Sequence, residues 1–255
     1  MGYWFGMDAD RRSATCGQPL TGGGPDWHHG REDFFAGLPR EREAFLAVAS
    51  RRTVAKHEFV FFENGPARSC HYLESGAVKI FRVAVHGREP TLFLRHPGEL
   101  FGLAEVIGGQ NRKCSAQAIA GSVIYCVARA DFEHLIERHH ALARRVIGVL
   151  GARLRYLGEQ IENLVVCDVP TRLLKLFVYL CHDALSAGPQ SEITVPVELT
   201  QSQLAGLTGS CQQTVSEILS MYESKGWIVV SRKQVRLRDP GAILAHLGKI
   251  AAGRE

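Results

Sequence analysis

Two helix-start signals, separated by a glycine, constrain the C-terminal part of the chain. Thr200 precedes Gln203 by three positions and Ser210 precedes Gln213 by three, so each pair can form a capping box. In a capping box, the hydroxyl and amide side chains satisfy backbone amides that the helix leaves unpaired. Gly209 can adopt the left-handed conformation that ends one helix where the next begins. The spacing predicts two short helices joined by a tight turn.

The apolar positions of this stretch indicate how the two helices pack. Leu204, Val215 and Ile218 would face one another across the turn, and Ala205 is small where the helices must approach closely. This combination is typical of a helix-turn-helix, whose second helix enters the major groove of DNA.

Two alternating apolar segments follow, at 227–231 and 234–238, and predict a β-hairpin with basic residues at its tip. A hairpin after a helix-turn-helix makes a winged helix, whose cations can contact phosphates. The predicted DNA-contacting residues are Thr200, Ser210, Gln212, Gln213, Ser216, Glu217, Arg232 and Lys233.

Short β segments separated by glycines extend from Thr53 to about Ala128. The glycines recur every eleven residues, which suits a turn after each strand. Several short strands in series favour a small barrel or jelly roll, which can hold a ligand or can be a packed domain. The recurring glycines are Gly65, Gly76, Gly87 and Gly98, and the predicted strands include 58–62, 71–74, 77–83, 91–95 and 123–127.

A long helix is predicted from about His139 to Val166, after a short helix at 131–138. Six apolar residues in it alternate spacings of three and four, as in a coiled-coil seam. Packing on the chain's own barrel is the alternative, but the narrow seam favours a parallel dimer that could read two DNA half-sites. The seam residues are Ile147, Leu150, Leu154, Leu157, Ile161 and Leu164.

Pro170 disfavours helical geometry at the residue before it and predicts a break between the long helix and the C-terminal region. The predicted fold class is α+β, with further elements at 39–48 (helix), 173–185 (helix) and 193–199 (strand). The predicted domains are a flexible extension (1–34), a β-roll sensor (35–138), a dimerisation helix (139–167), a winged helix-turn-helix (168–241) and a C-terminal tail (242–255).

Composition excludes several classes of protein. The apolar fraction of 45% and charged fraction of 22% are ordinary for globular domains, and the net charge of +4 is too small to indicate nucleic-acid binding by itself. Seven cysteines without regular spacing, and no secretion signal, indicate a reducing compartment. No apolar run reaches the roughly 18 residues of a membrane helix, so we expect a cytoplasmic protein without membrane contact.

The order of a β-roll, a long helix, a break at 168–170 and a winged helix resembles the Crp/Fnr family of bacterial transcription regulators. The resemblance covers about 34–239 and is most specific in LTQSQLAGLTGSCQQTVSEIL at 199–219. The segment from Lys225 to Leu244 is similar to the FixK and NtcA branches. The resemblance implies a roll like that of cyclic-nucleotide-binding domains, a homodimer on pseudo-palindromic promoter DNA, RNA polymerase as a partner, and no enzymatic activity.

The resemblance also implies an effector pocket in the roll. Members that bind cyclic AMP carry Gly-Glu near the start of a phosphate cassette and Arg-Ser or Arg-Thr near its end. In this chain the glutamate is displaced and Cys114 intrudes beside the arginine, which disfavours a cyclic nucleotide. Solvated charges in a surface loop are the alternative interpretation of Arg112 and Lys113. The candidate pocket residues are Gly102, Glu105, Arg112, Lys113 and Ser115.

Other cofactors have weaker signals. The oxygen-sensing branch ligates an iron–sulfur cluster through several N-terminal cysteines, whereas only Cys16 precedes the roll here, so this cluster is not expected. Haem could bind through His71, His86 or His96, but no pattern selects one, and we interpret each as a surface residue. No metal site and no catalytic residue are predicted, and the cofactor stays open.

Two other functions compete with DNA reading. A cupin-like metalloenzyme would need two histidines one residue apart on a strand, whereas His71, His86 and His96 are scattered. A β-roll ligand-binding module that acts through protein partners would not need the capping boxes or the basic wing.

The second helix of the pair departs from its relatives, which commonly place Arg-Glu near its start and Arg four residues after that Glu. Gln212, Gln213 and Glu217 occupy the matching positions. Gln can pair with adenine and Glu with cytosine, whereas Arg prefers guanine, so the operator should differ from the Crp and Fnr consensus.

Cys211 is predicted in the first turn of that helix, where the helix dipole and nearby cations favour a thiolate. One hypothesis is that its oxidation blocks the DNA surface. The alternative is a small residue chosen to fit.

Overall fold

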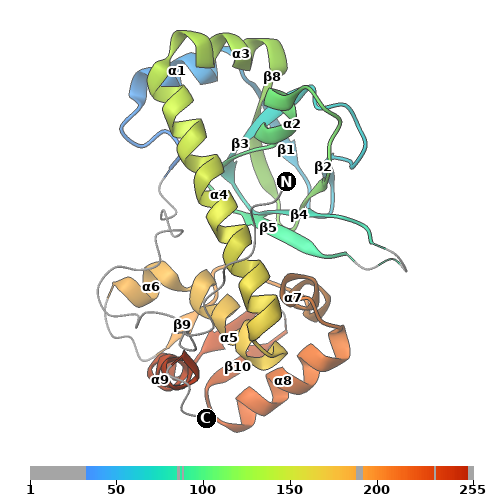
Figure 1. Ribbon diagram of the computed structural model, residues 1–255, viewed down its shortest axis with the longest axis vertical. Helices are drawn as coiled ribbons and strands as arrows, with labels where there is room; N and C mark the ends of the chain where they lie inside the picture. Colours follow the sequence, from blue (N-terminus) through green and yellow to red (C-terminus); the bar gives the residue numbers. More distant parts are fainter. Residues whose placement is uncertain (1–32, 85–86, 88, 188–191, 233, 252–255) are drawn as a thin grey trace, which may run out of the picture.

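The computed structural model describes residues 33–84, 87, 89–187, 192–232 and 234–251. A long helix, α4 (His140–Val166), runs from a β-rich N-terminal domain to a largely helical C-terminal domain (Figure 1). The predicted α+β class is confirmed, because a β-roll, a long helix and a winged helix-turn-helix follow one another in that order.

The roll consists of two four-stranded antiparallel sheets, ordered β1-β8-β3-β6 and β2-β7-β4-β5. Their inner faces bury a cluster that includes Leu73, Phe101 and Ile124, each at most 1% exposed. The strands are β1 (Ser50–Val54), β2 (Phe59–Phe61), β3 (Ser69–Ser75), β4 (Val78–Phe81), β5 (Thr91–Arg95), β6 (Leu100–Phe101), β7 (Ser115–Ala118) and β8 (Ser122–Ala128).

Three of the four regularly spaced glycines turn the chain in the left-handed conformation. Gly76, Gly87 and Gly98 have φ angles of 93°, 72° and 89°, whereas Gly65 has no positive φ. At Gly76 a Cβ would lie 2.2 Å from Ser122 Oγ, so the turn also needs the missing side chain. The sequence does not predict β1, β6 or β7, because these strands are short or carry mainly polar and small residues.

Three helices flank the roll and, with the first half of α4, enclose a second apolar cluster around Phe45 and Phe132. The first helix confirms the prediction at 39–48, although Val48 is exposed. The flanking helices are α1 (Pro39–Val48), α2 (Leu103–Gly108) and α3 (Arg129–Arg138).

The predicted extension 1–34 lies outside the described residues as far as position 32, but its last two residues are packed. Phe34 is 3% exposed, and its amide donates to Gly98 O at 2.7 Å. The Tyr72 hydroxyl donates to a carboxylate oxygen of Asp33. The boundary at 34 is therefore wrong, because Asp33 and Phe34 belong to the roll.

The C-terminal domain starts almost directly after α4. α5 (Val169–Leu180) begins four residues before the predicted helix at 173, and α6 (His182–Ser186) follows it. Asp168 caps α5 by accepting a hydrogen bond from Thr171 N at 2.9 Å. Pro170 lies in the first turn of α5, where its missing amide costs nothing, whereas α4 already ends at Val166, four residues earlier.

The winged helix-turn-helix completes this domain. The predicted strand at 193–199 is only two residues long, and a three-stranded sheet forms in the order β10-β11-β9. The elements are β9 (Ile193–Thr194), α7 (Gln201–Thr208), α8 (Gln212–Ser224), β10 (Ile228–Ser231), β11 (Gln234–Leu237) and α9 (Pro240–Ala251).

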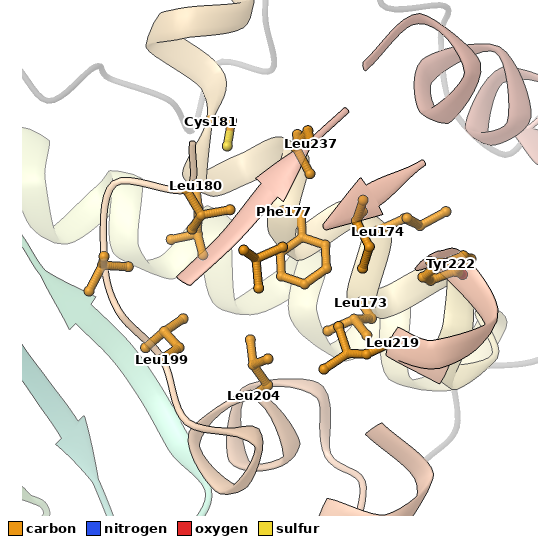
Figure 2. Close-up of a cluster of buried hydrophobic side chains, with 14 of the residues drawn as sticks. Leu173, Leu174, Phe177, Leu180, Cys181, Leu199, Leu204, Leu219, Tyr222 and Leu237 are labelled. Carbon is orange, nitrogen blue, oxygen red and sulfur yellow. The ribbon is translucent and has the colours of Figure 1, made fainter. Parts of the chain in front are cut away.

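An almost wholly apolar core holds these elements together (Figure 2). Leu173, Leu174 and Phe177 of α5 are fully buried at its centre, between α7, α8 and the wing. Ile243 and Leu247 of α9 join the same cluster. The predicted C-terminal tail at 242–255 is therefore wrong, because 240–251 form a helix that closes the core.

Among the described residues, no helix is both long and apolar enough to cross a bilayer.

Candidate nucleic-acid interface

The helix-turn-helix begins with the predicted capping box. Thr200 Oγ1 accepts from Gln203 N at 3.2 Å, and Gln203 Oε1 accepts from Thr200 N at 2.8 Å. Leu204 and Ala205 are buried against α8, as the sequence predicts. These contacts fix where α7 begins and which of its faces meets α8.

The turn and the start of α8 differ in one respect from the prediction. Gly209 has the expected left-handed conformation, with φ of 63°. The second capping box at Ser210 is wrong, because Cys211 is the N-cap residue of α8 and no side chain caps that helix. Instead, Ser210 N donates to Ala205 O at 2.9 Å and closes α7. The sequence placed the start of α8 one residue too early, since Ser is a more common cap than Cys.

One face of α8 is polar and exposed, because Val215, Ile218 and Leu219 bury the opposite face. Gln213 Nε2 donates to Glu217 Oε1 at 3.1 Å, so these two side chains form a pair in the free protein. Ser220, which the sequence pattern does not single out, lies one turn beyond Ser216 on this exposed side. The exposed face comprises Gln212, Gln213, Glu217 and Ser220, with Ser216 half-buried beside them.

The wing brings a cation close to the start of α7. Arg232, at the tip between β10 and β11, has φ of 57° and is exposed, whereas Lys233 lies outside the described residues. A groove of about 380 Å³ separates the wing from the two helices. It is lined by residues that include Thr200, Gln201, Ser202, Gln212 and Arg232.

Gln201 and Ser202 are therefore part of the candidate interface, although the sequence analysis missed them. They are the first two residues of a capped helix. Their position directly after the predicted N-cap, Thr200, is the sequence feature that could have indicated them. Helix N-termini carry free amides and a positive dipole end, both of which suit a phosphate.

The junction between α4 and α5 is held by side chains from both helices. Arg172 donates to Cys167 O at 2.6 Å and to Thr208 O at 2.8 Å, so it ties the junction to α7. Lys175 Nζ donates to Asn163 Oδ1 at 2.7 Å.

The last seam residue touches the turn of the helix-turn-helix in the same chain. A Cβ at Gly209 would lie 2.9 Å from Leu164 Cδ2. The glycine therefore also leaves room for this leucine.

The C-terminal domain from α5 to α9, the candidate reading domain, also packs on the roll. Ala77, Leu94 and Ile119 of the roll join the core of the C-terminal domain. A Cβ at Gly206 of α7 would lie 2.6 Å from Glu89 O, so only glycine allows this approach. Lys56 and Glu198 form an ion pair of 3.8 Å between the two domains.

In the roll, Arg112 is buried at 2% exposure, so its interpretation as a solvated surface charge is wrong. It donates to Gly102 O at 2.8 Å and to Ser69 O, and lies 3.5 Å from Glu105 Oε2. Its guanidinium also stacks on Phe61, 4.1 Å from the ring centroid. Burial lowers the pKa of Arg112, while Glu105 counteracts that shift.

The other candidate pocket residues are only partly brought together with Arg112. Ser115 is buried and accepts from Glu63 N at 3.0 Å, whereas Lys113 is exposed. Protein carbonyls accept from both terminal nitrogens of Arg112, whereas its Nε has no hydrogen-bond partner among the described residues.

His71 is also buried, so its interpretation as a surface residue is wrong. Its Nδ1 lies 3.2 Å from Cys126 Sγ, and its ring stacks on Phe61. Burial, with the charges of Arg112 and Arg52, lowers the pKa of His71 to about 3, so this histidine is neutral near pH 7.

Metal ligands are not gathered within the part of the chain that the structure describes. That part contains no group of three or more His, Cys, Asp or Glu side chains suited to a metal ion. His96 is half-buried in the turn after β5, while Cys16 and His86 lie outside the described residues.

Comparisons with known proteins agree with the two-domain arrangement. Residues 51–139 match the model of the cyclic nucleotide-binding domain, and residues 171–245 match the Crp-like helix-turn-helix domain.

The chain is 30% identical over 180 residues to the CRP-like cAMP-activated global transcriptional regulator of Mycobacterium tuberculosis, covering 71% of this chain and 80% of that protein. It is 28% identical over 220 residues to the cyclic AMP receptor protein of Thermus thermophilus, covering 86% of this chain and 96% of that protein. The fold is similar to that of FixK2 from Bradyrhizobium japonicum, with a TM-score of 0.68, 21% identity, and coverage of 78% of this chain and 97% of that one.

Proposed function

Because the chain belongs to the Crp/Fnr family of DNA-binding transcription regulators, we propose that α8 reads bases in the major groove of a pseudo-palindromic promoter site. The observation that carries this proposal is the polar, exposed face of α8, which a rigid apolar core supports from behind. A helix held in this way can enter a groove without rearranging its own domain.

The proposed contacts divide into base readers and phosphate contacts. Gln212, Gln213 and Glu217 read base edges, with Gln suited to adenine and Glu to cytosine. Ser216 and Ser220 lie beside them on α8. The start of α7, at Thr200 to Ser202, and the wing cations Arg232 and Lys233 hold the phosphate backbone. Ser210 closes α7 and contributes to the interface by shaping the turn.

The proposed assembly is a homodimer joined through α4. Three large apolar side chains of α4 are spaced seven residues apart and are strongly exposed: Ile147 (69%), Leu154 (72%) and Ile161 (64%). Exposed apolar residues at this spacing are typical of a helix that packs on a second helix. Gly151 and Gly158 lie beside the seam, where small residues allow two helices to approach. Leu150, Leu157 and Leu164 complete the seam.

The roll would act as the sensor in this regulator, and the molecule it senses stays open. A ligand in the cassette would have to compete with Gly102 O, Ser69 O and Glu105 for Arg112, so cyclic AMP is not the ligand we propose. We expect the protein to work beside RNA polymerase in the bacterial cytoplasm, without catalytic activity.

The dimer and its DNA binding can be tested together with Leu154→Glu. A charge in the seam should give the mass of one chain in solution and should abolish high-affinity binding to a selected operator. Ile107→Glu is the matched control, because Ile107 is an exposed apolar residue on α2, away from the seam. An unchanged dimer mass in the Leu154 variant would refute the seam.

The main rival is a ligand-binding module that acts through protein partners. Selection from random DNA duplexes separates the two, because the rival would enrich no sequence motif.

A further inference from the structure

A second cavity lies outside the roll cassette, where the roll, α4 and the C-terminal domain meet. Its volume is about 840 Å³, within the range of small-molecule sites. The turn between β5 and β6, residues 141–156 of α4, and Tyr179, His182 and Asp183 line most of it. Gly102, Glu105 and Arg112 do not line it, so it is distinct from the cassette.

The lining carries an excess of positive charge. Among the described residues of the lining, only Glu99 and Asp183 are carboxylates. The arginines are Arg95, Arg144, Arg145, Arg153 and Arg155.

Two of these arginines act on the carboxylate of Glu99, Arg95 through a hydrogen bond and Arg153 through its charge alone. Arg95 NH1 donates to Glu99 Oε2 at 2.9 Å, and Arg153 donates to the neighbouring carbonyl of Leu100. Burial and the charge of Arg95 lower the pKa of Arg153 to about 9, although Glu99 counteracts the shift. Arg95, Arg153 and Glu99 therefore carry one more positive than negative charge among the described residues.

Among these residues, Arg95 gives the strongest indication of a bound ligand. The residue is 7% exposed, and its Nε is buried without a hydrogen-bond partner among the described residues. Buried polar atoms are nearly always paired, so an orphaned guanidinium nitrogen in a cavity wall indicates a missing acceptor.

An aromatic wall stands beside the arginines. The rings of Phe93, Tyr156 and Tyr179 follow one another at centroid distances of 5.7 and 5.5 Å. The Arg95 guanidinium lies 4.5 Å from the centroid of Phe93. The cavity thus offers a charged end and an apolar side, as sites for organic anions do.

We propose that this cavity binds a small organic anion whose carboxylate or phosphate oxygens meet Arg95 and Arg153. Guanidinium forks suit both kinds of oxyanion. Ile147, Gly148 and Gly151 of the lining lie on or beside the seam, so the α4 of a second copy would wall the open side.

The same anion would also influence DNA reading, because it touches the roll, the dimerisation helix and the end of α5 at once. This second half of the inference depends on the proposed function, whereas anion binding itself does not.

The test is calorimetric titration of the full chain with citrate and with pyrophosphate at constant ionic strength. Tighter binding of citrate would indicate a carboxylate ligand, and tighter binding of pyrophosphate would indicate a phosphate ligand. We expect Arg95→Met to weaken the bound probe about tenfold or more, the usual loss for a charge-assisted hydrogen bond. Arg144→Gln, at the exposed rim, should weaken it several-fold and covers the case in which the Arg95 variant does not fold. Arg129→Gln is the control, because Arg129 is an exposed arginine outside the cavity.

The site is overturned if neither probe binds more tightly than chloride, or if both cavity variants bind as the wild type does. Operator affinity is then measured with and without the better probe. A change supports the coupling, and no change overturns it while leaving the site intact. Anion binding by a protein that selects no DNA motif would overturn the proposed function and not the site.

Discussion

The roll and the reading domain bury different kinds of side chain. The roll encloses Lys79, Arg95, Arg112 and His71, all at most 8% exposed. In the described part of the reading domain, the buried polar residues are two threonines, and the rest of the interior is apolar. The roll thus buries lysine, arginine and histidine side chains, whereas the described interior of the reading domain buries none of these.

In the reading domain, the residues that stabilise the fold differ from those on the proposed reading surface. In the roll, the buried arginines both stabilise the fold and lie at the candidate ligand sites. A buried charge needs its partners, so the fold of the roll depends on protonation and on ion pairing. The reading surface rests on a core that does not depend on it. Substitutions in the roll should therefore disturb folding, and those on α8 should disturb recognition alone.

The strongest test of this contrast is Arg112→Ala. It leaves Glu105 and two carbonyls without their donor and opens a void, so the free energy of unfolding should fall by about 3–5 kcal/mol. Urea unfolding measures the loss. Arg129→Ala should cost about 0–1 kcal/mol, because its ion pair with Glu133 is exposed. Equal losses in the two variants would contradict a charged interior for the roll.

Acid should weaken the roll through His71. Between pH about 6.5 and about 3 the unfolded chain binds a proton that the folded chain refuses, so the free energy of unfolding falls as the pH falls. By pH 5 the loss from this residue is about 2 kcal/mol. Comparing urea unfolding of wild type and His71→Gln at pH 7 and pH 5 isolates it. A variant that loses as much stability as the wild type between these pH values would refute the assignment.

On α8, Gln213→Ala should cost about 1–3 kcal/mol of operator binding and relax one base position in each half-site. The free energy of unfolding should stay within about 0.5 kcal/mol of wild type, because Gln213 is exposed. Glu217 loses its hydrogen-bond partner in this variant but stays on the exposed face of α8. Ser224→Ala, near the far end of α8, is the control. An unchanged selected motif would show that this helix does not read bases.

The wing should strengthen binding to all DNA sequences equally, because its cations would contact phosphates and not bases. Arg232→Asn removes the charge but tolerates the left-handed backbone, so the logarithmic salt slope of DNA binding should decrease by about 1. Lys233→Ala should act in the same way. A change in the selected motif instead of the slope would assign base reading to the wing.

Cys211→Ser should have the smallest effect, and only under oxidation. Cys211 is exposed at the N-cap of α8, with Sγ 3.1 Å from Thr214 Oγ1. Mild peroxide should weaken DNA binding of the wild type in gel-shift titrations and leave the variant unaffected. Equal sensitivity of the two proteins would exclude Cys211 as a redox switch.

Much of the fold was predictable because its signals are local and periodic. The long helix is predicted to within one residue of α4, since its seam repeats over several turns. The helix-turn-helix is predicted from Gly209 and one real capping box. α9 was missed although it has a start signal: Asp239 accepts from Ala242 N at 2.8 Å, and Pro240 occupies the first turn.

The candidate sites were less predictable because their contacts join distant residues. Arg112 is buried because Ser69 O, 43 residues earlier, and Phe61 lie beside it, and no local pattern reports this. The anion cavity likewise combines β5, α4 and α5, so it exists only in the folded chain. Charge alone could not tell a buried arginine from a solvated one.

The contact between Leu164 and Gly209 has a consequence for how such regulators diverge. The leucine ends the seam through which we propose that two copies join, and the glycine forms the turn before α8, the proposed reading helix. A larger residue at 209 would need both a smaller one at 164 and a tolerance for positive φ. Among relatives, we expect a larger side chain at position 209 to occur together with a smaller one at position 164. Dimer pairing and DNA-sequence preference would then evolve together.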